Sequence, residues 1–224
     1  MYVANHFRIP QPILDELLST VRFGTLVTVH ADGPIATPVP FYVEKRGDQT
    51  VAVTHLVRNN PHAREAITGP GLVLLNMADA YVSPAWYATN EAMPNVPTWD
   101  YITVQIRGAV KIDLSPERAL HAAKELTRRM GEEWCLEQVG SDKLEKMAHA
   151  IVGVEVVAEE IVGKAKMTQN RHPEDVASLI EQFDADGKTQ LAEFLREVSL
   201  PYATERFALM ARTREGYSER NSLL

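Results

Sequence analysis

The sequence lacks the features that mark several large classes of protein. It holds one cysteine, Cys135, among 224 residues, so no internal disulfide can form and we expect a reducing, cytoplasmic setting. The acidic neighbours of Cys135 in EEWCLEQ disfavour a thiolate and indicate a structural residue. No apolar run approaches the roughly 20 residues that cross a bilayer, and the start MYVANHFRIP has neither a basic flank nor an apolar core. We therefore expect no membrane span and no signal peptide.

Positive charge is also scarce. The chain carries 23 Lys and Arg against 30 Asp and Glu, a formal charge of −7, which repels a phosphate backbone unless basic residues are strongly localised. The densest basic stretch, RFALMARTREGYSER, has acidic residues among its arginines and is typical of a solvated helix face. The charge balance therefore disfavours direct binding of nucleic acid.

The motifs of several enzyme classes are missing. No glycine-rich GxGxxG or GxxxxGKS turn occurs, no two histidines have the HExxH spacing, and no Cys/His zinc pattern is present. Ser83 has no GxSxG elbow around it. The carboxylate pairs at 132–133 and 159–160 are adjacent, so in regular structure they point apart and suit solvent better than acid/base chemistry.

The patterns that are present indicate a β-rich body with inserted and appended helices. The length suits one barrel-sized core, and we expect a barrel domain over residues 1–171 followed by a helical extension over 172–224. Alternating runs with turns at 31–34 and 46–48 predict three strands between residues 23 and 56. Helices are predicted at 11–21, 60–68, 116–130, 142–149, 173–183 and 189–198, and further strands at 71–77, 101–113 and 151–167.

Three local features refine this interpretation. Gly108, inside a long predicted strand, marks a bulge or a close approach of two backbones. Ser115 is expected to cap the helix that follows it, and Pro116 fits that helix's first turn. The last twenty or so residues are polar, so we expect them to be partly loose.

Two strand ends are rich in hydrogen-bond donors. The stretch HLVRNNP at 55–61 joins a strand to a helix and could receive a phosphate, or it could be a capped helix with a solvated arginine. The stretch KAKMTQNR at 164–171 contains three cations and no acid, although cations at a strand end are common. Together with the aromatic segment AYVSPAWYATNEAMPNVPTWDY at 80–101, these ends are what a flat phosphorylated cofactor needs.

Six groups of short motifs follow one another along residues 1 to about 183. They are Met1-Tyr2-Val3 with His6-Phe7, Gly24-Thr25-Leu26-Val27-Thr28, His55-Leu56 with Asn60-Pro61, Ala80-Tyr81-Val82-Ser83-Pro84 with Trp86-Tyr87, Pro97-Thr98-Trp99 with Tyr101, and Gln169-Asn170-Arg171. In these motifs the chain resembles the PaiB family, the FMN-binding negative transcriptional regulators. That family is related to the split β-barrels of the pyridoxamine-phosphate-oxidase type.

The resemblance implies an α+β protein built on a six-stranded split β-barrel that forms a homodimer. It implies FMN in a groove between the subunits and a flavin-dependent oxidoreductase acting on a small molecule. The residues carried over fall into four groups: Thr37, Pro38 and Val39 with Pro40 along the isoalloxazine; His55, Arg58, Asn59 and Asn60 at the phosphate; Trp86, Thr98 and Trp99 closing the site; and Lys166, Gln169 and Arg171 completing its polar shell from the same chain or its partner.

The chain departs from the family pattern at three places. Asp100 stands where asparagine usually follows Pro-Thr-Trp, and Ala78-Asp79 replaces a Gly-Pro. Thr-Pro-Val-Pro at 37–40 replaces the more usual Ser/Thr-His-Leu-Pro and so lacks a histidine. A negative charge at Asp100 is unfavourable beside a phosphate.

A second interpretation comes from the piperazate synthases, which are similar to PaiB proteins in sequence. They use haem b to close an N–N bond in an N-hydroxylated ornithine, and here His55, or next His6, would be the axial iron ligand. Asp79 and Asp100 would then meet a cationic amine. A third interpretation, a transcriptional regulator, predicts DNA affinity that collapses with salt, and the acidic charge counts against it.

Overall fold

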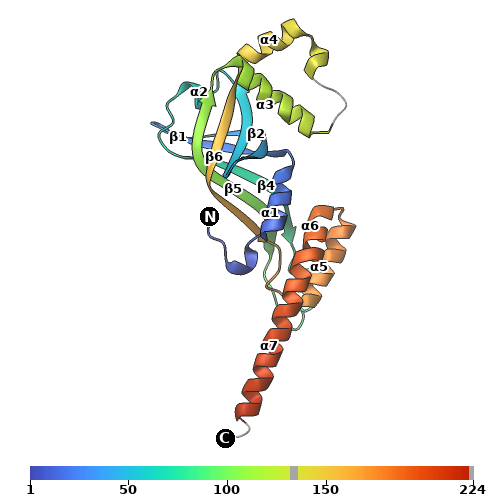
Figure 1. Ribbon diagram of the computed structural model, residues 1–224. Coiled ribbons are helices and arrows are strands. Elements are labelled where there is room, and N and C mark those ends of the chain that lie inside the picture. Colours follow the sequence, from blue (N-terminus) through green and yellow to red (C-terminus); the bar gives the residue numbers. More distant parts are fainter. Residues whose placement is uncertain (132–135, 222–224) are drawn as a thin grey trace. The chain divides into compact units, whose positions relative to one another are not determined.

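The architecture is an α+β barrel. The structure is a computed structural model that describes residues 1–131 and 136–221, so Cys135 lies outside the described residues. Six strands close a barrel in the order β1-β2-β3-β6-β5-β4, and every strand pair whose register is known is antiparallel (Figure 1). The strands are β1 (Arg22–His30), β2 (Gly33–Arg46), β3 (Gln49–Val57), β4 (Gly71–Val82), β5 (Thr98–Asp113) and β6 (Ile151–Lys166). The predicted six-stranded barrel with helices is confirmed.

Strands β1 to β3 form two hairpins whose turns fall where the sequence placed them. In β1 every second residue is buried, from Gly24 to His30. The register pairs Leu26 with Thr37 across β1 and β2. Gly47, with φ of 60°, makes the second turn in a left-handed conformation that favours glycine.

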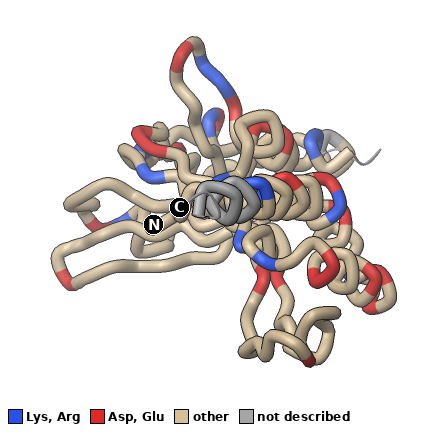
Figure 2. The backbone as a smooth tube through the Cα atoms, turned by 90° about the horizontal axis from the view of Figure 1, so that it is seen from below, with Lys and Arg blue, Asp and Glu red and all other residues tan. Residues whose placement is uncertain are grey.

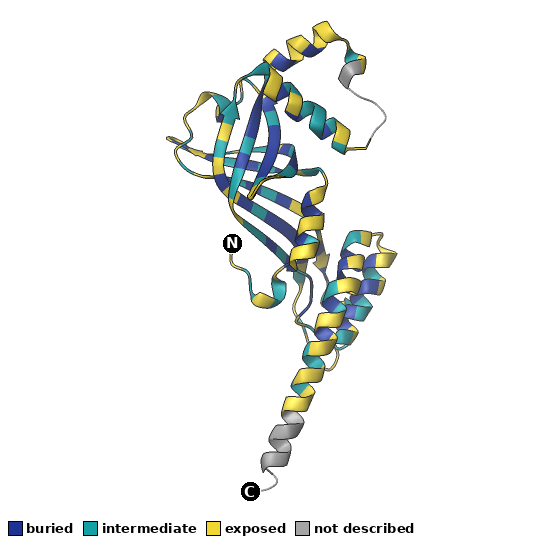
Figure 3. Ribbon diagram, viewed as in Figure 1, coloured by how far each residue is buried: buried dark blue, intermediate teal, exposed yellow. Residues whose placement is uncertain are grey.

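The predicted close approach at Gly108 is confirmed. A Cβ built on this residue would lie 1.8 Å from the carbonyl oxygen of Val157, so β5 and β6 meet there at a distance that only glycine permits. The same two strands supply buried side chains such as Ile106 and Val154. The barrel interior is therefore filled by alternate residues, as the dark blue positions along the strands in Figure 3 show.

The helices of the first 150 residues lie close to their predicted ranges. They are α1 (Gln11–Ser19), α2 (Pro61–Arg64), α3 (Pro116–Arg129) and α4 (Ser141–Ala150), with short 3-10 turns at Asn5–Phe7, Pro84–Trp86 and Leu136–Val139. Helix α2 is shorter than predicted because Glu65 already has an extended backbone. The Ser115 hydroxyl does not cap α3; it donates to Asp113 Oδ1 over 2.7 Å.

The C-terminal part is helical throughout its described length. It consists of α5 (Pro173–Ala185), α6 (Thr189–Phe194), a π-helical turn (Leu195–Ser199) and α7 (Leu200–Asn221). The expected loose chain end is therefore wrong for residues 200–221. Pro201 fits the first turn of α7, and Ala203 is fully buried, so this helix is anchored near its start. Among the described residues, no helix has the length and apolarity needed to cross a membrane.

The described residues divide into two compact units, which we call unit 1 and unit 2. Unit 1 contains Ile9–Met77 and Thr103–Gly163, and unit 2 contains Tyr2–Arg8, Ala78–Ile102 and Lys164–Leu224. The division expected at residue 171 stays a prediction, but in this structure the aromatic segment belongs with the C-terminal helices. The predicted cofactor residues therefore fall into two groups, and each is described below within its own unit.

Candidate functional site

A buried cluster of polar side chains, which we call the Thr28 cluster, lies in unit 1. It comprises Thr28 and His30 of β1, Thr37 of β2, Asn60 at the start of α2 and His62 within α2. Thr28 and His62 are fully buried, and His30 is 4% exposed. Because β1 pairs with β2 through Leu26 and Thr37, the alternation of side chains places Thr28 and Thr37 on the same face of the sheet.

The Thr28 cluster is linked by a continuous run of hydrogen bonds. Thr28 Oγ1 lies 2.5 Å from His30 Nε2 and 2.6 Å from His62 Nδ1. The other nitrogen of His62, Nε2, lies 2.9 Å from Thr37 Oγ1. Burial lowers the pKa of His62, and the neighbouring His30 lowers it further, so His62 is held as a neutral imidazole that can both donate and accept.

Two of the three predicted phosphate residues at 58–60, Arg58 and Asn60, have hydrogen-bond partners within the protein. Asn60 Oδ1 accepts the backbone N–H of His62 over 3.1 Å and caps α2, while its amide lies 3.5 Å from Thr37 Oγ1. The guanidinium of Arg58 donates to three backbone carbonyls, those of His149, Leu114 and Ile151, at 2.8–3.2 Å. Arg58 therefore joins three chain segments, whereas the Asn59 side chain is exposed.

The remaining predicted residues of unit 1 lie on β2 and β3. Thr37 is half-buried, Pro38 is exposed and Val39 is buried, as expected for alternate residues of a strand. His55 of β3 is half-buried, and its Nδ1 is a buried atom with no hydrogen-bond partner. Burial lowers the pKa of His55 and favours its neutral form.

In unit 2 a lysine joins two of the predicted closing residues. Lys166 Nζ, at the end of β6, donates to Thr98 Oγ1 over 2.5 Å and to the carbonyl oxygen of Trp99 over 2.6 Å. The indole of Trp99 is 51% exposed and donates through Nε1 to Asp79 over 2.8 Å. Its ring meets Tyr81 edge to face, at 6.1 Å between centroids. Thr98, Trp99 and Lys166, which were predicted to belong to one site, are therefore in direct contact.

A buried carboxylate lies beside this lysine. Asp100 is 1% exposed, its Oδ2 accepts a hydrogen bond of 2.6 Å from Thr168 Oγ1, and its Oδ1 has no hydrogen-bond partner. Burial raises the pKa of Asp100 to about 6, although the Thr168 bond and the charges of Lys166 and Arg171 act to lower it. Thr168 has φ of 58°, an unusual conformation for a threonine. Asp100 is therefore buried and not exposed at the surface, and its expected contact with a cationic amine stays a prediction.

The other predicted residues of unit 2 serve local structure. Gln169 is 2% exposed, and its side chain bonds the backbone of Met167 and Ala165 at 2.8 and 2.7 Å, so it is fully used within its own turn. Arg171 donates to Asn95 and lies 5.3 Å above the ring of Tyr87. Trp86 is half-buried, and its carbonyl oxygen accepts a hydrogen bond of 2.8 Å from the Ser178 hydroxyl.

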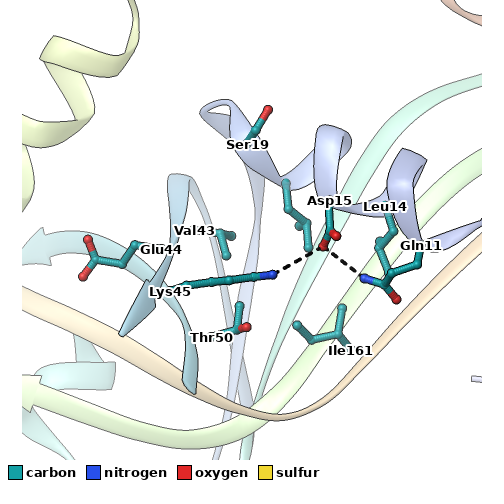
Figure 4. A pocket seen from close by; sticks show the side chains of 10 residues that line it. Gln11, Leu14, Asp15, Ser19, Val43, Glu44, Lys45, Thr50 and Ile161 are labelled. Carbon is teal, nitrogen blue, oxygen red and sulfur yellow. Dashed lines mark hydrogen bonds and ion pairs between the residues drawn. The ribbon is translucent and has the colours of Figure 1, made fainter. Parts of the chain in front are cut away.

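A surface pocket of about 420 Å³ lies elsewhere in unit 1, between α1 and strands β2, β3 and β6. In Figure 4 the side chains of Lys45 and Gln11 point toward Asp15, with Lys45 Nζ 3.9 Å from the carboxylate and Gln11 donating over 3.0 Å. None of the predicted cofactor residues lines this pocket. This pocket therefore does not support the assignment of those residues to a cofactor site.

The closed six-stranded barrel with its helices, and the polar cluster beside the β1–β2 hairpin, define the class of protein as an α+β barrel. The family model described as "Putative FMN-binding domain" matches residues 1–160. The chain therefore belongs to this family, and its resemblance to PaiB proteins is confirmed.

The chain is similar to several proteins of known sequence or structure. The chain is 30% identical over 210 residues to "Protease synthase and sporulation protein PAI 2" of Bacillus subtilis, an alignment that covers 88% of this chain and 97% of the relative. It is 29% identical over 134 residues to the yeast protein YKL070W of Saccharomyces cerevisiae, covering 50% and 79%. A crystal structure of the Mycobacterium tuberculosis protein Rv2991 has a TM-score of 0.49 at 17% identity, covering 74% of this chain and 90% of that one.

His30 and His62, the two buried histidines of the Thr28 cluster, were not among the site residues predicted from the sequence. A signal was present, because Gly24, Leu26, Thr28 and His30 alternate along β1 and the last two are polar residues at positions that a barrel buries. The contribution of His62 could not be read in this way. It lies 34 residues from Thr28, and only the folded path of β2, β3 and α2 brings the two together.

Proposed function

We propose that the protein binds FMN and acts as a flavin-dependent oxidoreductase on a small organic molecule. The observation that carries this proposal is the family match over residues 1–160, a range that contains the whole Thr28 cluster. The bound flavin would supply two-electron chemistry, since its ring system accepts and returns hydride equivalents. The chain's own residues bind the cofactor, orient it and manage protons.

The residues of unit 1 fit an acceptor-rich ligand. When His62 Nε2 carries its proton, Thr37 Oγ1 accepts from His62 and from Asn60, which leaves the Thr37 hydroxyl proton for a carbonyl or ring nitrogen of the ligand. The exposed amide of Asn59 adds a donor for a phosphate. Arg58 has a different role in this proposal: through its carbonyl contacts it positions the turn that presents both asparagines.

The groups of unit 2 enter the proposal as separate candidates. Trp99 offers a half-exposed indole for stacking on a flat ring, and Lys166 offers the positive charge that a phosphate needs. Trp86 and Arg171 stay candidates for the same site, while Gln169 shapes the turn that precedes Arg171. Each of these assignments can be tested alone by its effect on flavin affinity.

We also propose that the functional form is a homodimer. Unit 2 exposes large apolar side chains along the aromatic segment, among them Tyr81 at 46%, Met93 at 55% and Val96 at 70%. A cluster of this kind is typical of a surface that meets a partner. Binding of DNA is not part of the proposal, because the chain carries 30 acidic against 23 basic residues, and blue and red positions are interspersed along the tube in Figure 2.

A haem-dependent activity is the second candidate, and one observation favours it. His55 is held neutral by burial, and neutral imidazole is the form that ligates iron. However, metal-bound histidines ordinarily donate a hydrogen bond from their second nitrogen, and His55 Nδ1 has no partner. For this reason we rank haem second to FMN as the proposed cofactor. The N–N bond-forming activity would require bound haem.

The deciding experiment is the visible spectrum of the purified protein, followed by extraction and chromatography of the bound cofactor. FMN should be recovered near one molecule per chain, and its affinity should fall at least tenfold in Thr37→Val but stay within threefold in Thr37→Ser. A Soret band that is lost in His55→Ala would establish haem instead. A colourless protein that takes up neither FMN nor haem on titration would refute both proposals.

A further inference from the structure

The Thr28 cluster has two complete hydrogen-bonding arrangements. In the first, His30 donates from Nε2 to Thr28, Thr28 donates to His62 Nδ1, and His62 donates from Nε2 to Thr37, whose own proton points outward. In the second, every one of these bonds runs the other way, and His30 carries its proton on Nδ1. Both arrangements hold the same number of protons, and converting the first into the second along the hydrogen bonds takes up one proton at His30 Nδ1 and releases one from Thr37 Oγ1.

This exchange requires no charged intermediate inside the cluster. A hydroxyl between two imidazoles accepts one proton as it gives up another, and each imidazole does the same through its two nitrogens. Thr28 and His62 are fully buried, so water cannot replace any link between them. The lowered pKa of His62 keeps it neutral, the state in which it can pass a proton in either direction.

Both ends of the cluster face groups that can exchange protons. At one end the buried His30 Nδ1 has no hydrogen-bond partner, and the Glu65 carboxylate, which is 51% exposed, lies 4.0 Å away. A small rotation of the Glu65 side chain would bring it within hydrogen-bond distance. At the other end Thr37 is half-buried and belongs to the residues assigned to the flavin.

We propose that His30, Thr28, His62 and Thr37 form a proton relay that connects the exposed carboxylate of Glu65 with the ligand bound at Thr37. This inference rests on the proposed function for the identity of that ligand. A bound flavin that receives a hydride from an organic donor would take up one proton as well to reach its neutral reduced form. The relay supplies it: solvent protonates His30 Nδ1 through Glu65, one proton moves along each link, and Thr37 Oγ1 gives its proton to a basic atom of the ligand.

The first test needs no cofactor. In cofactor-free protein with nitrogen-15 in the histidine rings, NMR should show His62 averaged between its two tautomers, because both arrangements are populated. Thr28→Val keeps the side-chain shape but removes the central hydroxyl, so His62 should become a single tautomer with its proton on Nε2. Thr28→Ser should restore the averaging. A single unchanged tautomer in the wild type and in Thr28→Val would overturn the relay.

A matched control separates the relay from a simple loss of a buried hydroxyl. Thr54 on β3 is also fully buried and donates to the Pro40 carbonyl over 2.7 Å, but it has no part in the cluster. Thr54→Val should leave the His62 signals averaged. If Thr28→Val does not fold, His30→Phe breaks the same run at its outer end and should also fix the His62 tautomer; continued averaging in that variant would overturn the proposal.

The second test uses the flavin-loaded protein. Thr28→Val should bind flavin as tightly as the wild type, while the rate of flavin reduction by an excess of a reduced nicotinamide should fall at least tenfold and Thr28→Ser should stay within threefold. An undiminished rate in Thr28→Val would refute the relay. If the wild type binds no flavin, the proposed function fails, and the tautomer measurement still decides whether the relay exists.

Discussion

Replacing Asp100 by asparagine should change how stability depends on pH. The wild-type carboxyl is buried, and one of its oxygens has no hydrogen-bond partner, so the folded state favours its protonated form. Its pKa is about 6 in the folded protein and 3.8 for an unperturbed aspartate. At about 1.36 kcal/mol per pH unit this difference corresponds to roughly 3 kcal/mol.

The direction of the effect follows from which state binds more protons. Between pH 3.8 and about 6 the folded chain holds a proton on Asp100 that the unfolded chain has released. The stabilisation is therefore complete below pH 3.8 and is lost as the pH rises through about 6. At pH 7 and above, the wild type carries a buried charge that Asp100→Asn does not.

The assay is urea unfolding of both proteins from pH 4 to pH 8. All other groups titrate alike, so the difference between the two free energies of unfolding isolates Asp100. This difference should shift in favour of Asp100→Asn by roughly 2.5 kcal/mol across the range, because the full effect is reached only below pH 3.8. Thr168→Val removes a hydrogen bond that lowers the pKa of Asp100, so its stability should continue to fall to a higher pH than that of the wild type. A difference that stays constant with pH would refute the reasoning.

Three further predictions concern stability in unit 1. Gly108→Ala should cost more than about 3 kcal/mol in the free energy of unfolding, since its Cβ meets the Val157 carbonyl, whereas Gly69→Ala, with open space around it, should cost less than about 0.5 kcal/mol. Arg58→Met should cost about 2 kcal/mol by urea titration, because three carbonyls lose a charged donor. Glu155→Gln should cost about 1 kcal/mol at pH 7, and this cost should shrink as the pH falls below 4.5, since arginines lower the pKa of Glu155 in the folded state and its contribution is lost on protonation.

The strands were predictable because their signals are local. Alternation along β1 and turn residues at both hairpins are properties of neighbouring residues, and Gly108 interrupts a long alternating run. The chain end was mispredicted since polarity alone does not distinguish a loose segment from an exposed helix. One buried anchor, Ala203, accompanies a sequence of good helix formers in α7.

The candidate site was predictable only as a set of residue types. Donors at the end of β3 were found, but the sequence could not show that the guanidinium of Arg58 is engaged by three carbonyls or that Gln169 bonds its own turn. Hydrogen-bonding side chains are assigned to partners by the fold, and those partners lie up to 93 residues away. A donor-rich stretch therefore indicates where polar groups are concentrated, not which of them remain available to a ligand.

Both units bury polar atoms that have no hydrogen-bond partner, among them His30 Nδ1 in unit 1 and Asp100 Oδ1 in unit 2. In the Thr28 cluster both nitrogens of His62 are bonded, and the bonds leave a half-buried hydroxyl at Thr37 as the outlet. In unit 2 the buried Asp100 Oδ1 has no hydrogen-bond partner, although Lys166 Nζ lies 3.9 Å away, and burial of this carboxylate lowers stability above about pH 6. Asparagine at this position would carry no charge, so the comparison of the wild type with Asp100→Asn measures what burying this carboxylate costs.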